Sequence, residues 1–273
     1  MTLFALTLGC TPPVEAPAEL GELTLYLYEN FEGEGVDGEG ALPAGLLRLE
    51  EWLVDQPLSP DDDVDDRAVT PPDLTSDRLG GAVAPATADE TMQVPVAVYV
   101  RAKEDMDTQL ELLLDENQVC IASGTTTWHQ QSWTDGDADC FADGSCDVLR
   151  SEQEIHIDSL ANVFLDIQRD FRWIELDDGR MAVVAREWLP EQEDAYDGDG
   201  TWDQRYSLIV WLPEADGKVL RFYSMWSSVT LAGIGDDFYA NTVKNGLNEH
   251  FENSVTFAAG ESCDDRDNAK PEG

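Results

Sequence analysis

The sequence has few basic residues and no basic cluster. Its 273 residues include 16 Lys plus Arg against 57 Asp plus Glu, which gives a formal net charge of −41 at pH 7. A protein that neutralises nucleic-acid phosphates needs a local basic patch, and attraction to anionic lipid headgroups needs one as well. We therefore expect no nucleic-acid partner and no direct electrostatic attraction to a membrane surface.

The common catalytic signatures are also missing. The sequence contains no Walker, G-x-S-x-G or H-E-x-x-H motif. Residues 33–38 match G-x-G-x-x-G, but two carboxylates in this loop would repel a bound phosphate. The three histidines offer few general bases: His129 could line a pocket, His156 is expected to be exposed on a strand, and His250 is expected to be structural. These absences favour a binding protein over an enzyme.

A third absence is any segment long and apolar enough to cross a bilayer. The first ten residues, MTLFALTLGC, form only a short apolar run that ends in Gly9 and Cys10. This run resembles the end of a bacterial lipoprotein signal peptide, which is cut before the cysteine so that the thiol can carry diacylglycerol. The resemblance implies residues 1–10 as a signal remnant, lipidation at Cys10, and a lipid-anchored protein of the bacterial cell envelope, on the outer membrane or facing the periplasm.

The residues around this run fit a lipid anchor. Residues 11–21 are rich in proline and would act as an extended tether between Cys10 and the folded body. A basic segment ahead of the apolar run is missing, so we expect the start codon to lie upstream.

Cysteine usage supports export independently. The sequence has five cysteines, and assigning Cys10 to lipid leaves four, which allow three pairings. Cys140 and Cys146 bracket a short, turn-rich loop and are the easiest pair to close, which leaves Cys120 and Cys263 as a long-range disulfide. A metal-thiolate site is the competing explanation, but C-x-x-C spacing is absent. We therefore expect two disulfides and an oxidising compartment.

The N-terminal third predicts a strand, a helix and a linker. Residues 22–28 alternate between leucine and other side chains, as in a half-buried strand, and leucines from 42 to 53 recur at helical spacing behind Pro43. Together they make a predicted strand-helix unit over 22–54. Residues 55–92 are acidic and rich in proline with few large apolar side chains, which predicts a linker or loop.

The rest of the sequence predicts an α+β core over residues 93–257, followed by a polar tail over 258–273. Its expected elements are a strand at 94–100, a helix at 103–116, strands at 154–158, 163–176, 180–189, 205–212 and 218–231, and a helix at 236–255. Tight turns at 177–179 and 215–217 join successive strands. Asp236 or Asp237 is expected to cap the final helix.

This order of elements resembles the helix-grip fold of the START and polyketide-cyclase-like superfamily. The resemblance implies a curled antiparallel sheet packed against a long C-terminal helix, with a hydrophobic ligand held between them. We therefore predict an α+β protein that binds an apolar small molecule without a cofactor. An α+β sandwich with a fully packed interior would give the same pattern, and an enzyme similar to polyketide cyclases is a further alternative.

Aromatic residues on the predicted sheet are the candidates for contact with such a ligand, although core packing is their default role. Arginines recur on the same strands. A row of this kind most often faces solvent, but one arginine turned inward could pair with a ligand carboxylate. The predicted ligand-binding residues are Trp173, Trp188, Trp211, Trp226, Arg186 and Phe251.

One acidic loop matches part of a calcium-binding pattern. Asp135, Asp137 and Asp139 alternate as hard-cation ligands do, but the sixth and twelfth positions hold cysteines in place of Gly and Glu. A second loop, at 197–203, is similar. These loops raise an alternative function, a surface interaction or structural lipoprotein that binds calcium weakly.

Overall fold

The computed structural model describes residues 15–32, 40–75, 77–79, 94–196, 198, 200–260 and 270–271. The helices are α1 (Leu20–Glu29), α2 (Ala41–Leu53), the 3-10 helix η1 (Val64–Arg67), α3 (Met106–Leu114), α4 (Ala138–Ala142) and α5 (Asp236–Ala258). The strands are β1 (Ala68–Val69), β2 (Val94–Ala102), β3 (Thr126–Asp135), β4 (Val148–Asp158), β5 (Asn162–Glu175), β6 (Met181–Trp188), β7 (Glu193–Asp194), β8 (Gly200–Pro213) and β9 (Val219–Leu231).

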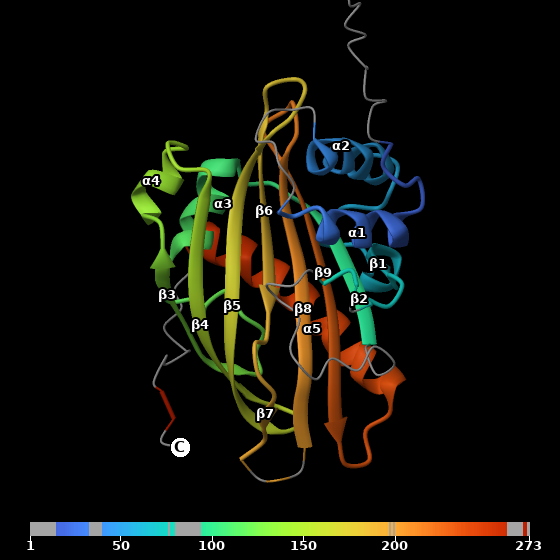
Figure 1. Ribbon diagram of the computed structural model, residues 1–273, viewed down its shortest axis with the longest axis vertical. Coiled ribbons are helices and arrows are strands. Elements are labelled where there is room, and N and C mark those ends of the chain that lie inside the picture. Colours follow the sequence, from blue (N-terminus) through green and yellow to red (C-terminus); the bar gives the residue numbers. More distant parts are fainter. Residues whose placement is uncertain are drawn as a thin grey trace, which may run out of the picture.

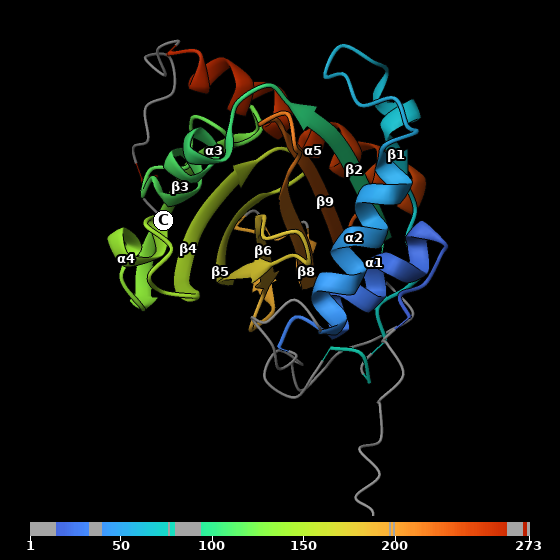
Figure 2. The same ribbon diagram turned by 90° about the horizontal axis from the view of Figure 1, so that it is seen from above.

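Within the described residues, nine strands form one antiparallel sheet. Its order is β1-β2-β9-β8-β6-β5-β4-β3, and the short β7 pairs with β8. Figure 1 shows the long strands side by side, with α5 crossing behind them and α1 and α2 in front. Seen from above, the sheet curls (Figure 2). Successive strands from β3 to β6 are neighbours, so hairpins account for this part of the sheet.

The long helix α5 lies against the concave face of the sheet. It has 23 residues, which corresponds to about 35 Å, enough to cross several strands. Its own residues Tyr239, Leu247 and Phe251 are buried. They join a core formed with inward side chains of β2, β5, β6, β8 and β9. The predicted fold class, an α+β protein with a curled antiparallel sheet packed against a long C-terminal helix, is confirmed.

Helices α1 and α2 cover the convex face, and the strand predicted over 22–28 is wrong. These residues form α1, with Leu23, Leu25 and Leu27 all buried although they point in different directions. The sheet, α2 and the segment near Pro72 pack around most of α1, so its leucines are buried on a wide face, with Glu22 and Glu29 on the remaining exposed side, and an alternating pattern arises by chance. At Gly45 a Cβ would lie 2.6 Å from Leu27 Cδ2, so the glycine allows α2 to approach α1 closely.

The segment predicted as a linker packs on the body where the structure describes it. Leu58, Leu74 and Leu79 are buried in the convex-side core, and β1 pairs with β2. Arg67, only 1% exposed, donates to Tyr99 O at 3.4 Å and to Asn248 Oδ1 of α5 at 2.6 Å. Arg67 anchors this segment through hydrogen bonds rather than apolar contacts. The segment therefore needs few large apolar residues. Residues 80–92 of the predicted linker lie outside the described residues.

The other predicted elements are confirmed in kind, with corrections to several. Strand β8 begins at Gly200 rather than at 205, and the short β1, β7 and η1 were not predicted. Strand β3 and the first half of β4 were not predicted, because their inward side chains are polar. The cysteine loop contains the short helix α4. The N-cap of α5 is Gly235, without a side-chain hydrogen bond, while Asp236 and Asp237 lie in the first turn, where carboxylates favour the positive end of the helix dipole.

Candidate functional site

A cavity of about 160 Å³ lies between the concave face of the sheet and α5. Both strands and helix contribute apolar side chains to its wall, among them Ile155, Leu160, Trp202, Met225, Val243 and Leu247. Its polar groups come mainly from the sheet and the middle of α5: His129, Arg169, Arg205, Tyr223 and His250. Hydroxyl side chains, among them Ser123, Thr126 and Thr242, also reach the wall, so the cavity combines a largely apolar surface with several polar groups, as ligand sites usually do.

A buried ion pair supports the polar part of the wall. Arg169 Nε donates to Glu187 Oε1 at 2.5 Å, and Arg169 Nη2 contacts the same oxygen. The Tyr223 hydroxyl donates to Glu187 Oε2 at 3.1 Å, while Arg205 Nη2 remains 3.8 Å from that oxygen. Burial alone would raise the pKa of Glu187, but the charges of Arg169 and Arg205 and the hydrogen bonds outweigh it and lower the pKa to about 2. Glu187 is thus ionised near pH 7.

The two histidines at the cavity are neutral near pH 7. Burial, together with the charge of Arg169, lowers the pKa of His129 to about 4. Arg221 Nη2 donates to His250 Nε2 at 3.2 Å, and burial and this arginine lower the pKa of His250 well below its ordinary value. Among the described residues that line the cavity, the charged ones are therefore Arg169 and Arg205, with Glu187 bonded behind them.

Glutamines connect this wall to α3. His129 Nε2 lies 2.9 Å from Gln153 Oε1, and Gln153 Nε2 donates to Gln131 Oε1 at 3.3 Å. Gln131 Nε2 in turn donates to Leu113 O at 2.8 Å, at the end of α3. These bonds satisfy polar side chains that would otherwise be costly to bury. They explain how β3 can place polar residues inward.

His156 was expected to be exposed, and this is wrong. It does lie on the outer face of β4, away from the cavity, but it is only 4% exposed. Phe164 packs against its ring at 4.6 Å between centroids, and its Nε2 lies 2.6 Å from Asn162 Oδ1. A neighbouring strand, which alternation in a single strand does not reveal, covers it.

None of the six predicted ligand residues lines this cavity. Trp188, Trp226 and Arg186 belong to the convex side, where Arg186 pairs with Glu32 at 2.6 Å. The others, Trp173, Trp211 and Phe251, do face the concave side but pack in its core, and Trp211 lines a smaller adjoining cavity of about 20 Å³. Alternation assigns residues to two faces without saying which face is concave.

The arginine row divides between the two faces in the same way. Arg169, Arg205 and Arg221 turn toward the concave interior, whereas the default expectation was solvent. Trp202 was missed for a different reason. The pairing register of β8 shifts between Trp202 and Gln204, so that Trp202 and Arg205 face the cavity although they differ by an odd number of positions.

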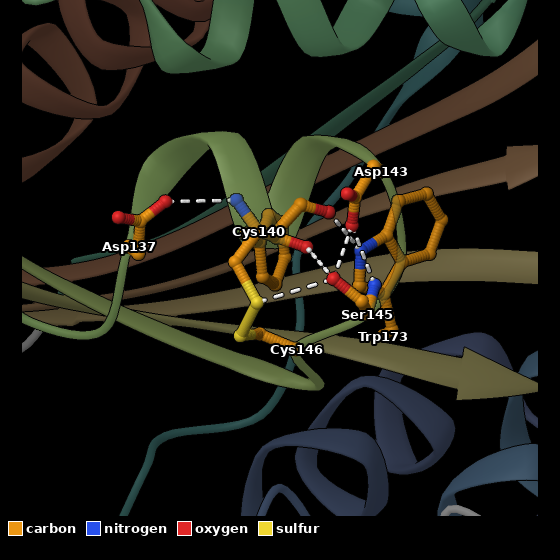
Figure 3. The surroundings of a disulfide bond; sticks show 7 residues. Asp137, Cys140, Asp143, Ser145, Cys146 and Trp173 are labelled. Carbon is orange, nitrogen blue, oxygen red and sulfur yellow. Dashed lines mark hydrogen bonds between the residues drawn. A yellow bond between two sulfur atoms is a disulfide. The ribbon is translucent and has the colours of Figure 1, made fainter.

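The aspartates predicted to bind calcium have other partners. Asp137 Oδ1 accepts from Cys140 N at 2.9 Å and caps α4 (Figure 3). Asp135 pairs with Arg150 at 3.3 Å. Among the described residues, no group of three or more His, Cys, Asp or Glu side chains is placed to hold a metal ion, and this includes Asp139. Asp197 and Asp199 of the second loop lie outside the described residues.

The short disulfide is confirmed. Cys140 and Cys146 are bonded, with 5.3 Å between their Cα atoms. The bonded loop is held against the sheet where Trp173 Nε1 donates to Phe141 O at 2.7 Å (Figure 3). Cys120 is also disulfide-bonded. Its predicted partner Cys263 lies outside the described residues.

The N-terminal residues with the predicted lipidation site Cys10 also lie outside the described residues. Elsewhere, in the part of the chain that the structure describes, no helix is both long and apolar enough to span a membrane.

The comparisons with known proteins find similarity in the fold of the chain but not in its sequence. No family model matches the sequence, and no curated protein matches it. A STAR-related lipid transfer protein from Xanthomonas axonopodis is 15% identical over 60% of this chain and 85% of that one, with a TM-score of 0.43. A START superfamily protein from Mycobacterium smegmatis is 9% identical over 61% and 97%, with a TM-score of 0.39. The Zhui aromatase/cyclase from Streptomyces sp. R1128 is 11% identical over 62% and 92%, with a TM-score of 0.38.

At these identities and TM-scores, no ligand or activity carries over from those proteins. The fold and the cavity define an α+β protein in which a curled sheet packs against a long helix, with a cavity between the two. The ligand of this cavity has to be inferred from the residues that line it.

Proposed function

We propose that the protein binds a small, mainly apolar molecule in the cavity between the sheet and α5, and that it holds this molecule without converting it. The observation that carries the proposal is the cavity, about 160 Å³ in volume and walled largely by side chains such as Ile155, Trp202 and Leu247. An apolar cavity of about 150 Å³ is large enough to take up benzene. The ligand is therefore about as large as a single ring or a medium-length alkyl chain.

Gly246 offers a matched pair of variants that tests this proposal. It lies on α5 at the cavity wall, and the nearest atom to an added Cβ would be Ser123 Cβ at 3.9 Å. Gly246→Ala should keep binding and stabilise the helix by about 0.5 to 1 kcal/mol. Gly246→Phe should fill the cavity and abolish binding. The measurements are calorimetric titration with 1-octanol as a neutral apolar probe and native mass spectrometry of the purified protein.

Three results count against the proposal. Wild-type protein that neither binds 1-octanol nor carries a co-purifying molecule would have no ligand of this class. Equal binding by the alanine and phenylalanine variants would place the ligand elsewhere. A product detected after incubation with the bound molecule would refute the non-catalytic role.

The protein acts outside the cytoplasm, anchored by lipid on Cys10 in the bacterial cell envelope. This part of the proposal is supported by the first ten residues and by the disulfide between Cys140 and Cys146, since such bonds persist in oxidising compartments. In a bacterial host, the chain should fractionate with membranes and its mature form should begin at Cys10 with an acylated thiol. Cys10→Ser should abolish both cleavage and acylation, which intact-mass analysis measures. An unmodified thiol in the wild type would contradict the anchor.

A further inference from the structure

The cavity wall carries a charge opposite to that of the chain. The chain has a formal charge of −41. Yet the described residues that line the cavity include Arg169 and Arg205 and no Asp or Glu. Glu187, buried behind them, balances only one of these two charges. The histidines are neutral, so the wall is positive overall.

Arg205 is the less satisfied of the two arginines. Its side chain is 12% exposed, and it approaches Glu187 Oε2 only to 3.8 Å, beyond hydrogen-bond length. A hydrogen bond with Tyr223 favours the charged form of Arg205. The Arg205 Nε, however, is buried and has no hydrogen-bond partner among the described residues. A buried guanidinium nitrogen without an acceptor is unfavourable, and an oxygen atom supplied by a ligand would relieve it.

A third buried arginine lies next to the cavity, at the smaller adjoining one. Arg221, 3% exposed, lies over the ring of Phe251 at 4.7 Å and contacts His250, and its Nε also has no hydrogen-bond partner among the described residues. Burial lowers its pKa to about 10, which still leaves it charged near pH 7. Aromatic rings offset part of this charge but provide no anion. The carboxylate of Glu104 offsets part of the charge of Arg221, so the Glu187 carboxylate is shared by Arg169 and Arg205 alone.

We propose that the ligand is an apolar carboxylic acid whose carboxylate binds to Arg205 and Arg169 while its apolar body lies against Ile155, Trp202 and Val243. This inference rests on the proposed function and specifies the ligand class of the same cavity. Guanidinium groups bind carboxylates through paired, charge-assisted hydrogen bonds. Because the side chains of Arg169 and Arg205 are mostly buried, salt screens this interaction less than it screens the acidic surface.

The test compares two eight-carbon probes of nearly equal shape, sodium octanoate and octanamide, by calorimetric titration of the full chain at pH 7. Octanoate should bind at least about tenfold more tightly than octanamide, because hydrogen bonds to charged groups are stronger than those between neutral groups. Arg205→Met should remove most of this preference and leave octanamide affinity within about threefold of wild type. Arg48→Met, which removes the same charge from α2 on the convex face, should leave both affinities unchanged.

The possible results separate the inference from the function on which it rests. If octanamide binds as tightly as octanoate, the arginines are structural and the inference is overturned, whereas the proposed function stands. If wild-type protein binds neither probe nor 1-octanol, the proposed function itself fails. If Arg205→Met does not fold, as judged by circular dichroism, the comparison of the two probes on the wild type still decides.

Discussion

Glu187→Gln is expected to lower the free energy of unfolding by about 3 to 5 kcal/mol, because removing one partner of a buried ion pair leaves the other charge uncompensated. Glu187 is 1% exposed and bonded to Arg169 and Tyr223, with Arg205 close by. A fall of its pKa from 4.5 to about 2 corresponds to about 3 kcal/mol, in line with this range. Urea unfolding at pH 7 measures the loss.

The pH dependence of the same variant has a definite sign. Because the pKa of Glu187 is lower in the folded state than in the unfolded state, its contribution is complete above about pH 5 and is lost as the pH falls toward 2. The difference in unfolding free energy between wild type and Glu187→Gln should therefore shrink steadily below pH 4.5. The titration of the other carboxylates affects the unfolding free energies of both proteins alike, so it cancels when one is subtracted from the other.

Glu51→Gln is the matched control. Glu51 pairs with Arg48 on the exposed side of α2, with its side chain 66% exposed, and exposed pairs contribute little. Its stability should stay close to that of the wild type at every pH. If Glu187→Gln behaves like this control, Glu187 does not hold the buried arginines, and the charge balance inferred for the cavity wall is wrong.

The fold could be predicted where one face of an element is buried and the other faces water. In α2 the leucines at positions 42, 46, 49 and 53 lie on the buried side, and in α5 the buried Tyr239, Leu247 and Phe251 recur at helical spacing. Their periodicity follows from one-sided burial, so sequence alone reveals it. In α1 burial over a wide face obscures the periodic signal, and three leucines at alternate positions then imitate a strand.

The candidate site was harder to predict, because it depends on the curvature of the sheet and on partners from distant strands. The sequence analysis placed both Trp211 and Trp226 among the ligand residues, although only Trp211 faces the side of α5, because alternation within a strand does not say which face is concave. A prediction that Arg169 and Arg205 face the interior requires knowing that Glu187, on the strand β6 between theirs, is their partner. The signal that could have found them is the presence of Glu187 at an inward position of an otherwise apolar strand, since a buried carboxylate requires a cationic partner.

The convex layer gives the second large effect. Trp226→Ala is expected to lower the free energy of unfolding by about 3 to 5 kcal/mol, as removal of a fully buried tryptophan usually does. Trp226 is 0% exposed, packs edge-on against Tyr28 of α1 at 5.6 Å, and donates from Nε1 to Pro72 O at 2.9 Å. The substitution removes contacts with α1 and with the 71–79 segment at once. Urea unfolding measures the loss of stability.

This variant also distinguishes packing from ligand contact. The sequence placed Trp226 among the ligand residues, whereas the structure places it on the face opposite the cavity, so Trp226→Ala should leave the affinity for 1-octanol within about threefold of wild type under conditions where the protein is folded. Phe238→Ala, at a position that is 56% exposed, is the control and should change neither quantity. A Trp226 variant with normal stability and lost binding would move the ligand to the convex side, and the cavity beneath α5 would then need another explanation.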